Sequence, residues 1–256
     1  MKQRAIAHYI DFGTVLRYLQ DVEEGSPIHG VGYVVDNIDR FFRDLKLFEL
    51  PVTERASPEL KALGEEFKER PADDVLTSED RTRLQGIVEA IRGTLFAESG
   101  GNFAFIVTDK RLDVAKLLGD VASLMGEEVF GKLPDIAQYD FIEGGKCIAF
   151  ERPTGAAFHI LRGTEDVLRH FYCSVVRRRR VDPLLWGLMV TSLRARRRRP
   201  PSAALLDNLD NIRRSFRNPT QHPDKIYDID EVQDLFGLCV EAVNRMVKSD
   251  QWLEAD

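Results

Sequence analysis

Residues 217–223 hold an arginine and a histidine, Arg217 and His222, that are separated by four residues in a segment with two prolines. A histidine titrates near neutral pH, so it can exchange a proton with a ribose hydroxyl or a leaving oxygen. An arginine fork can hold the non-bridging oxygens of a phosphate as charge grows on them. Asn218 can hydrogen-bond the same phosphate or orient the imidazole. Because the prolines restrict the backbone and fix the directions of these side chains, the segment suits phosphodiester cleavage.

The same residues also fit a purely structural interpretation. Arg217 can cap the free carbonyls at the end of a helix, and His222 can pack against Tyr227. In either case Pro219 disfavours helical backbone at the residue before it. We therefore expect a helix to end at Asn218 and His222 to lie in the loop that follows.

The elements that must position this segment form a helical bundle in the second half of the chain. From residue 154 onward, apolar residues recur at a spacing of three and four and form one stripe. Further helices are expected over residues 135–150, 183–199 and 204–218, and after residues 228–231, which resemble a capping box. We predict a mainly α fold with an antiparallel bundle of four to five helices over residues 135–250.

The first half of the chain, residues 1–130, is predicted to be a mixed, mostly helical region of unknown role. Helical spacing covers residues 36–48, 58–70 and 112–125, and Thr77 begins a capped amphipathic helix. Residues 103–107 are the best strand candidate, because they are aromatic and β-branched and lie between a Gly pair and Asp109. This region therefore contains at most a small β element.

Positive charge is concentrated in one part of an otherwise acidic chain. The net charge is −6, yet residues 177–217 hold 12 arginines against three aspartates. Such a zone is typical of a surface that binds an anion, although arginine runs can also be solvated helix faces. If RNA is the anion, its phosphates would be contacted by two runs, which are Arg177, Arg178, Arg179 and Arg180 together with Arg196, Arg197, Arg198 and Arg199.

Composition excludes several classes of protein. With 43% hydrophobic and 30% charged residues among 256, the chain is typical of a globular protein. No run of about 18 apolar residues is present, so no membrane span is expected, and the start does not match a signal peptide. The three cysteines are far apart, which predicts neither a disulfide framework nor a zinc site. We expect a cytoplasmic protein without a metal or a cofactor.

The bundle, together with the spacing Arg217-Asn218-x-x-x-His222, resembles the HEPN superfamily. The stretch Phe158-His159-x-x-Arg162-x-x-Glu165 is similar to a bacterial group of HEPN-type, abortive-infection-like proteins. The resemblance covers residues 135–250. It implies a metal-independent endoribonuclease in which the ribose 2′-hydroxyl attacks the adjacent phosphate. It also implies a homodimer with one composite Arg-His site, a toxin or effector role in stress or phage defence, and an antitoxin or defence-system protein as a further partner.

Two alternatives stay open at this point. His159, Arg162 and Glu165 can face His222 and support it, or they can form a hydrogen-bond network within the bundle. The whole bundle can also be a non-catalytic module that dimerises or binds a partner. A nuclease requires Arg217 and His222 to be exposed in a cleft, whereas a scaffold would bury them in hydrogen bonds.

Overall fold

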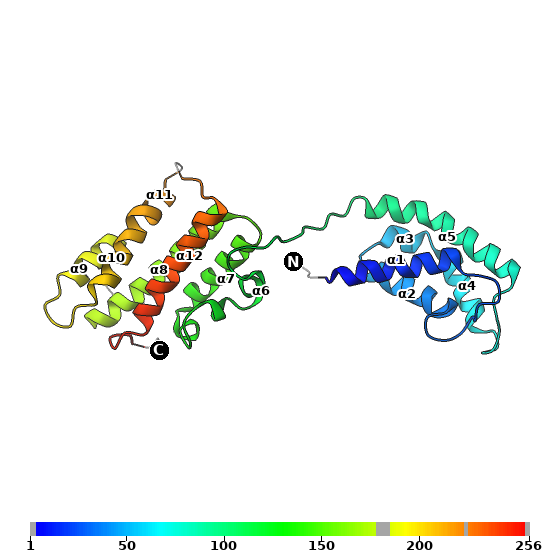
Figure 1. Ribbon diagram of the computed structural model, residues 1–256, viewed down its shortest axis with the longest axis horizontal. Helices are drawn as coiled ribbons and strands as arrows, with labels where there is room; N and C mark the ends of the chain where they lie inside the picture. Colours follow the sequence, from blue (N-terminus) through cyan, green and yellow to red (C-terminus); the bar gives the residue numbers. More distant parts are fainter. Residues whose placement is uncertain (1–3, 178–184, 223–224, 254–256) are drawn as a thin grey trace. The chain divides into compact units, whose positions relative to one another are not determined.

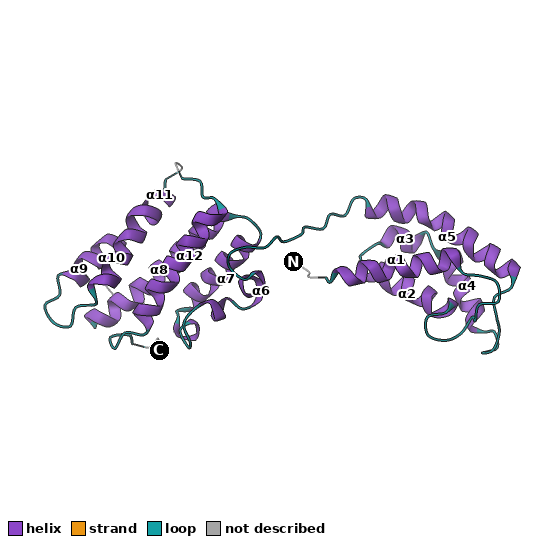
Figure 2. Ribbon diagram, in the orientation of Figure 1, coloured by secondary structure: helices purple, strands orange, loops and turns teal. Residues whose placement is uncertain are grey.

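The computed structural model describes residues 4–177, 185–222 and 225–253, and the chain folds into two compact units, Met1–Phe105 and Ile106–Asp256. Each unit has a hydrophobic core of its own. The described residues are mainly helical, as the sequence predicts, and Figure 2 shows helices joined by loops. Within the described part of the chain, none of the helices has both the length and the apolar character that a membrane span requires.

The first unit is built from five helices, labelled in Figure 1. They are α1 (Ile6–Asp21), α2 (Val34–Leu47), α3 (Pro51–Arg55), α4 (Pro58–Lys68) and α5 (Ser78–Ser99). The helices predicted over residues 36–48 and 58–70 and after Thr77 are confirmed. Thr77 accepts a hydrogen bond from the backbone of Asp80, and the Asp80 carboxylate accepts one from the backbone of Thr77, which closes a capping box.

The strand predicted over residues 103–107 is wrong. No strand occurs among the described residues, and their one β feature is an isolated bridge between Pro27 and Val75. Phe103, Phe105 and Ile106 are exposed and extended at the junction of the two units. Their β propensity has no effect here, since a strand is stable only when a neighbouring strand pairs with it and buries one face.

The second unit is a helical bundle whose elements follow one another through short links (Figure 1). Its helices are α6 (Val114–Gly119), α7 (Asp135–Ala149), α8 (Pro153–Val176), α9 (Trp186–Arg194), α10 (Ala203–Ile212), α11 (Asn218–Thr220) and α12 (Ile229–Val247), with the short 3₁₀ turns η1 (Val121–Leu124) and η2 (Phe130–Lys132) and the π-helical segment η3 (Arg213–Arg217).

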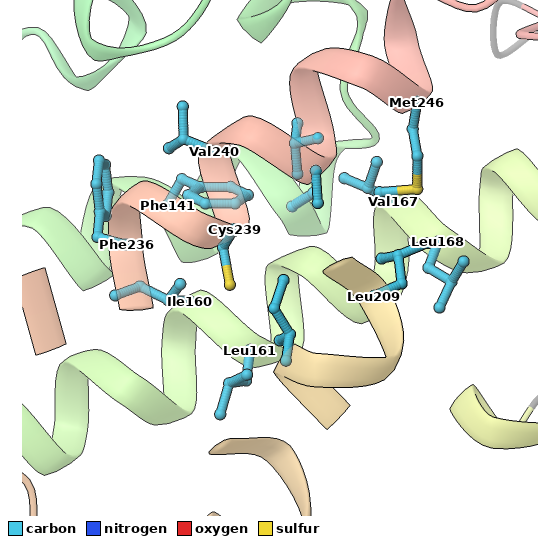
Figure 3. Packing of buried hydrophobic residues seen from close by; sticks show 14 of the residues in the cluster. Phe141, Ile160, Leu161, Val167, Leu168, Leu209, Phe236, Cys239, Val240 and Met246 are labelled. Carbon is cyan, nitrogen blue, oxygen red and sulfur yellow. The ribbon is translucent and has the colours of Figure 1, made fainter. Parts of the chain in front are cut away.

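The core of the second unit lies between α7, α8, α10 and α12. Figure 3 shows Ile160 and Leu168 of α8 and Phe236 and Cys239 of α12 in this core. Burying one such side chain contributes about 1.5–3 kcal/mol. Because Cys239 is completely enclosed, burial raises the pKa of its thiol to about 12, and it acts as a small apolar residue.

Residues 106–134 belong to the second unit rather than to a separate first half that ends at residue 130. Leu117, Val121 and Val129 are buried in the same core as α7 and α8. The Gln233 side chain of α12 accepts a hydrogen bond from the backbone of Leu112 at 3.1 Å. The division between the units therefore falls at residues 105 and 106, earlier than the sequence pattern suggests.

Two predicted helix ends are also wrong. α9 ends at Arg194, so Arg196, Arg197, Arg198 and Arg199 follow it in a loop rather than lying within it. The expected start of this helix at Pro183 lies outside the described residues. The second error concerns Asn218, which keeps helical backbone angles of −64° and −50° although a proline follows it.

Candidate active site

A cleft of about 780 Å³ opens between α7, α8 and the η3–α11 segment of the second unit. This volume lies within the range that small-molecule and nucleotide sites span. Three arginines, one histidine, three carboxylates and the rings of a tyrosine and a phenylalanine stand among its lining groups. The cleft is lined by Asp135, Ile136, Tyr139, Phe158, His159, Leu161, Arg162, Glu165, Asp166, Arg169, Arg217, Thr220 and Gln221.

Asp140 of α7 organises one side of this cleft from within the bundle. Its side chain is completely buried, and its two oxygens each accept a bond of 2.6 Å from the Arg162 guanidinium. One of these oxygens also lies 2.9 Å from Nδ1 of His159. Because a carboxylate only accepts, Nδ1 of His159 donates, and this fixes the orientation of the ring. The same contact with Asp140 raises the pKa of Arg162.

A glycine allows α7 and α8 to approach closely enough for these bonds. A Cβ atom on Gly163 would lie 3.1 Å from the Cβ of Asp140 and 3.4 Å from the carbonyl oxygen of Ala137. A side chain at this position would require the neighbouring atoms of α7 to shift by a few tenths of an ångström. The absence of a side chain at Gly163 therefore sets the distance between Asp140 and its two partners on α8.

Arg217 reaches the other side of the cleft from η3. Its Nη2 and Nε lie 3.3 and 3.4 Å from one oxygen of Glu165, whose other oxygen accepts a bond of 2.8 Å from Arg169. Arg217 is about one quarter exposed, with 28% of its side chain accessible. The predicted capping of carbonyls by Arg217 is therefore replaced by an ion pair at the wall of the cleft.

The π-helical segment explains how the chain passes through Pro219 without leaving the helix. The Asn218 N–H bonds to the carbonyl of Arg213, five residues earlier, and this wider turn precedes the proline. Beyond it, the Thr220 hydroxyl donates to the Phe216 carbonyl at 2.7 Å. Local π-helical turns are frequent at functional sites, and here the turn determines where Arg217 lies on the helix surface.

Tyr227 closes the loop that carries His222. Its hydroxyl lies 2.7 Å from that of Thr220, its ring stacks on Phe216, and its backbone N–H donates to Thr154 of α8. Burial raises the pKa of this tyrosine. The Tyr227 ring contacts Phe216 and its hydroxyl contacts Thr220. The described ring contacts of Tyr227 do not include His222, which the structural interpretation expects to pack against it.

His222 lies one residue beyond Gln221, which lines the cleft, and it is exposed. Its backbone N–H donates to the Pro219 carbonyl at 3.1 Å, so the residue completes the last turn of α11. The ring itself is not one of the groups that line the cleft. Asn218 is partly buried within the same turn.

The three residues of α8 that the sequence singles out all line the cleft and are all paired. His159 and Arg162 bond to Asp140, and Glu165 bonds to Arg217, so the predicted network within the bundle is present. None of the three is bonded to His222 among the described contacts. They therefore form the wall beside the Arg217 side chain.

Sequence reasoning missed Asp140, Asp166 and Arg169. Oδ2 of Asp166 is buried without a hydrogen-bond partner among the described residues, and burial raises the pKa of this carboxyl group. For Asp140 the sequence did contain a signal, because this carboxylate lies on the apolar stripe of α7 between Ala137 and Phe141. An acidic residue on a buried face requires partners, but its partners come from another helix.

The described members of the two arginine runs do not line the cleft. Arg177 is exposed at the end of α8, in a left-handed backbone conformation, and Arg178, Arg179 and Arg180 lie outside the described residues. Arg197, Arg198 and Arg199 are exposed and Arg196 is partly buried. Arg177 follows Glu165 by 12 residues, which places it about 18 Å further along the helix axis. The described members of both runs are absent from the lining of the cleft.

Comparisons with known proteins identify no relative of this chain. No protein-family model, no curated protein and no solved structure matches the chain. Among the described residues, no three His, Cys, Asp or Glu side chains are grouped so that they could hold a metal ion. The candidate site is therefore defined by its own side chains.

Proposed function

We propose that the second unit is a metal-independent endoribonuclease of HEPN type, a toxin or effector in stress or phage defence. The observation that supports this proposal is the cleft in which Arg217 stands beside Arg162 and Arg169, with His222 at the next turn of the chain. Tyr139 and Phe158, 56% and 48% exposed, belong to the same cleft. Unpaired RNA bases stack on such rings while arginines bind the phosphates.

In this proposal His222 acts as the general base and Arg217 stabilises the transition state. His222 takes the proton of a ribose 2′-hydroxyl while the oxygen attacks the adjacent phosphorus. Arg217 donates to the non-bridging oxygens as they gain negative charge. Its bonds to Glu165, at 3.3 and 3.4 Å, are longer than the roughly 2.7–2.9 Å of strong charge-assisted bonds. A phosphate can therefore replace Glu165 at modest cost.

The proposal includes a homodimer, because the resemblance implies that two copies bring their Arg217–His222 loops together. An antitoxin or a defence-system protein would be a further partner. A second candidate function is a non-catalytic bundle that dimerises or binds a partner. The ion pairs of Arg217 and Arg162 favour that alternative, since both guanidinium groups already have partners within the chain.

Cleavage of RNA in excess EDTA tests the proposal. The full chain is expected to cut single-stranded RNA and to leave 2′,3′-cyclic phosphate and 5′-hydroxyl ends. His222→Ala should lower the rate by about 10²–10⁴-fold, and its stability should change by less than about 0.5 kcal/mol because the ring is exposed. His8→Ala, an exposed histidine of the first unit, is the matched control. Wild-type protein that leaves RNA intact would favour the binding module, and cleavage that requires Mg²⁺ would refute the metal-independent mechanism.

A further inference from the structure

His159 differs from the other histidines in how its two ring nitrogens are placed. Nδ1 is bonded to the completely buried Asp140, and the ring lines the cleft with 29% of its side chain accessible. Since Nδ1 faces the interior, the accessible edge carries Nε2. By contrast, Nε2 of His29 and of His170 is bonded to a backbone carbonyl. His159 is thus a histidine held by a carboxylate with its second nitrogen available to a ligand.

His159 and His222 both belong to the stretch of the two segments between the Glu165–Arg217 ion pair and the bond from Tyr227 to Thr154. Two contacts show that α8 and the η3–α11 segment run in opposite directions. Glu165 pairs with Arg217. Thr154, 11 residues before Glu165, accepts a bond from Tyr227, 10 residues after Arg217. His159 precedes Glu165 by six residues and His222 follows Arg217 by five. The six residues of α8 correspond to about 9 Å along its axis, and the five residues after Arg217 lead in the same direction through α11 to the turn that holds His222. Leu161 and Gln221, close to the two histidines in sequence, both line the cleft.

Cleavage of RNA at this site requires two proton transfers, and His222 accounts for one of them. As the 2′-oxygen forms its bond to phosphorus, the bond from phosphorus to the 5′-oxygen breaks. The electron pair stays on the 5′-oxygen, which is a poor leaving group unless it receives a proton. The 5′-oxygen therefore needs a proton from a second acid–base group, and the candidates are the partner's His222 in the composite site and a group on the cleft wall of the same chain.

We propose that His159 is this second catalytic residue and that it donates the proton to the 5′-oxygen. The proposal rests on the ribonuclease function proposed above. His222 removes the 2′-hydroxyl proton and becomes the imidazolium, and His159 gives up its Nε2 proton and becomes neutral. The products are a 2′,3′-cyclic phosphate and a 5′-hydroxyl, and solvent restores both protons. Arg217 holds the phosphate.

Asp140 is the positioning residue for His159. It accepts the Nδ1 proton, so Nε2 is the nitrogen that exchanges a proton with substrate, and it offers a negative charge to the imidazolium form. Arg162 occupies both oxygens of Asp140 at 2.6 Å and prevents the carboxylate from rotating away. This arrangement explains why a buried carboxylate, an arginine and a partly exposed histidine are joined at the wall of a cleft.

A change of leaving group tests the role of His159. The linkage that the wild-type protein cuts is first mapped in an oligoribonucleotide and then remade with a bridging 5′-sulfur, which leaves without a proton. His159→Ala should cut the ordinary linkage about 10²–10⁴-fold more slowly and should cut the sulfur linkage within about tenfold of the wild-type rate. His222→Ala should be slow on both, because the 2′-hydroxyl still needs a base.

Two further variants distinguish a loss of proton transfer from a loss of folding. In His159→Asn the side-chain amide can still donate to Asp140 but cannot transfer a proton, so it should behave as His159→Ala does and melt like the wild type. His170→Ala, on the same helix but bonded to Leu253 instead of lining the cleft, should cut both linkages normally. A wild-type rate of His159→Asn on ordinary RNA would overturn the proposal, and so would equal losses on the two linkages. Failure of the wild type to cut any RNA would instead refute the ribonuclease function itself.

Discussion

Each unit of the protein contains a buried aspartate that binds an arginine through both carboxylate oxygens, and the two pairs serve different purposes. In the first unit Arg70 binds Asp80 at 2.7 and 2.8 Å, and the same carboxylate caps the start of α5. In the second unit Arg162 binds Asp140 at 2.6 Å through each oxygen. The distances in the two ion pairs are similar, although Arg70 donates through its two Nη groups and Arg162 donates through Nε and Nη2.

What differs is the third partner and the surface beside it. The third partner of Asp80 is Thr77, which does not titrate in the physiological range, and its carboxylate is fully used within the helix start. The third partner of Asp140 is His159, whose imidazole can donate and accept protons and lines a cleft. A buried ion pair thus points to chemistry only when it holds a group that can still react.

The largest effect that we predict is on RNA turnover, and it concerns the arginine at the wall of the cleft. Arg217→Gln should lower turnover of RNA by about 10²–10³-fold while changing RNA affinity much less, because the arginine acts on charge that develops in the transition state. Single-turnover rates and equilibrium binding, measured on the same RNA, separate the two quantities. Arg214→Gln is the control, since Arg214 is 70% exposed and pairs with Asp210 outside the cleft. Equal losses in affinity and turnover would indicate that Arg217 only binds.

The second prediction breaks the ion pair of the first unit. Asp80→Ala should destabilise that unit by about 2–3 kcal/mol, because it removes a helix cap and leaves Arg70 without its main partner. RNA cleavage should not change. Denaturant unfolding of the full chain followed by hydrogen exchange, which reports the two units separately, measures the difference. A loss of cleavage that accompanies an intact second unit would show that the first unit contributes to the site.

The same pair should make stability depend on pH. Bonds from Arg70 hold the pKa of Asp80 well below its usual range. Its contribution is therefore complete above the unfolded pKa of about 4 and declines as the pH falls below that value. The difference in unfolding free energy between the wild type and Asp80→Asn should shrink when the pH is lowered from 6 to about 2. A constant difference would contradict this assignment.

Most of the scaffold is predictable from local pattern, whereas the centre of the site is not. The stripe of α8 and the Thr77 cap each depend on residues within a few positions of one another, and both are confirmed. Asp140 depends on residues 19 and 22 positions away, so no local rule could reveal its partners. The rule that a helix ends before proline fails at Asn218, because a π-helical turn accommodates Pro219.

The smallest predicted effect concerns the arginine loop after α9. If this loop contacts RNA phosphates, replacing Arg197, Arg198 and Arg199 by Gln should lower the slope of log affinity against log salt concentration by up to about 0.7 for each lost contact. Turnover of bound RNA should stay the same, because the described arginines of this loop do not line the cleft. Filter binding over a range of salt concentrations measures the slope. An unchanged slope would indicate a solvated surface.

Gly163 also determines how the protein can be stabilised by design. Replacing a helical glycine by alanine commonly raises stability by about 0.5–1 kcal/mol, and Gly86 of α5 and Gly237 of α12 have open space where the methyl group would go. At Gly163 the same change would meet the Cβ of Asp140 at 3.1 Å. A stabilisation campaign that treats all helical glycines alike would therefore strain the contact between α8 and Asp140, the residue that positions His159, without altering any residue that touches a ligand.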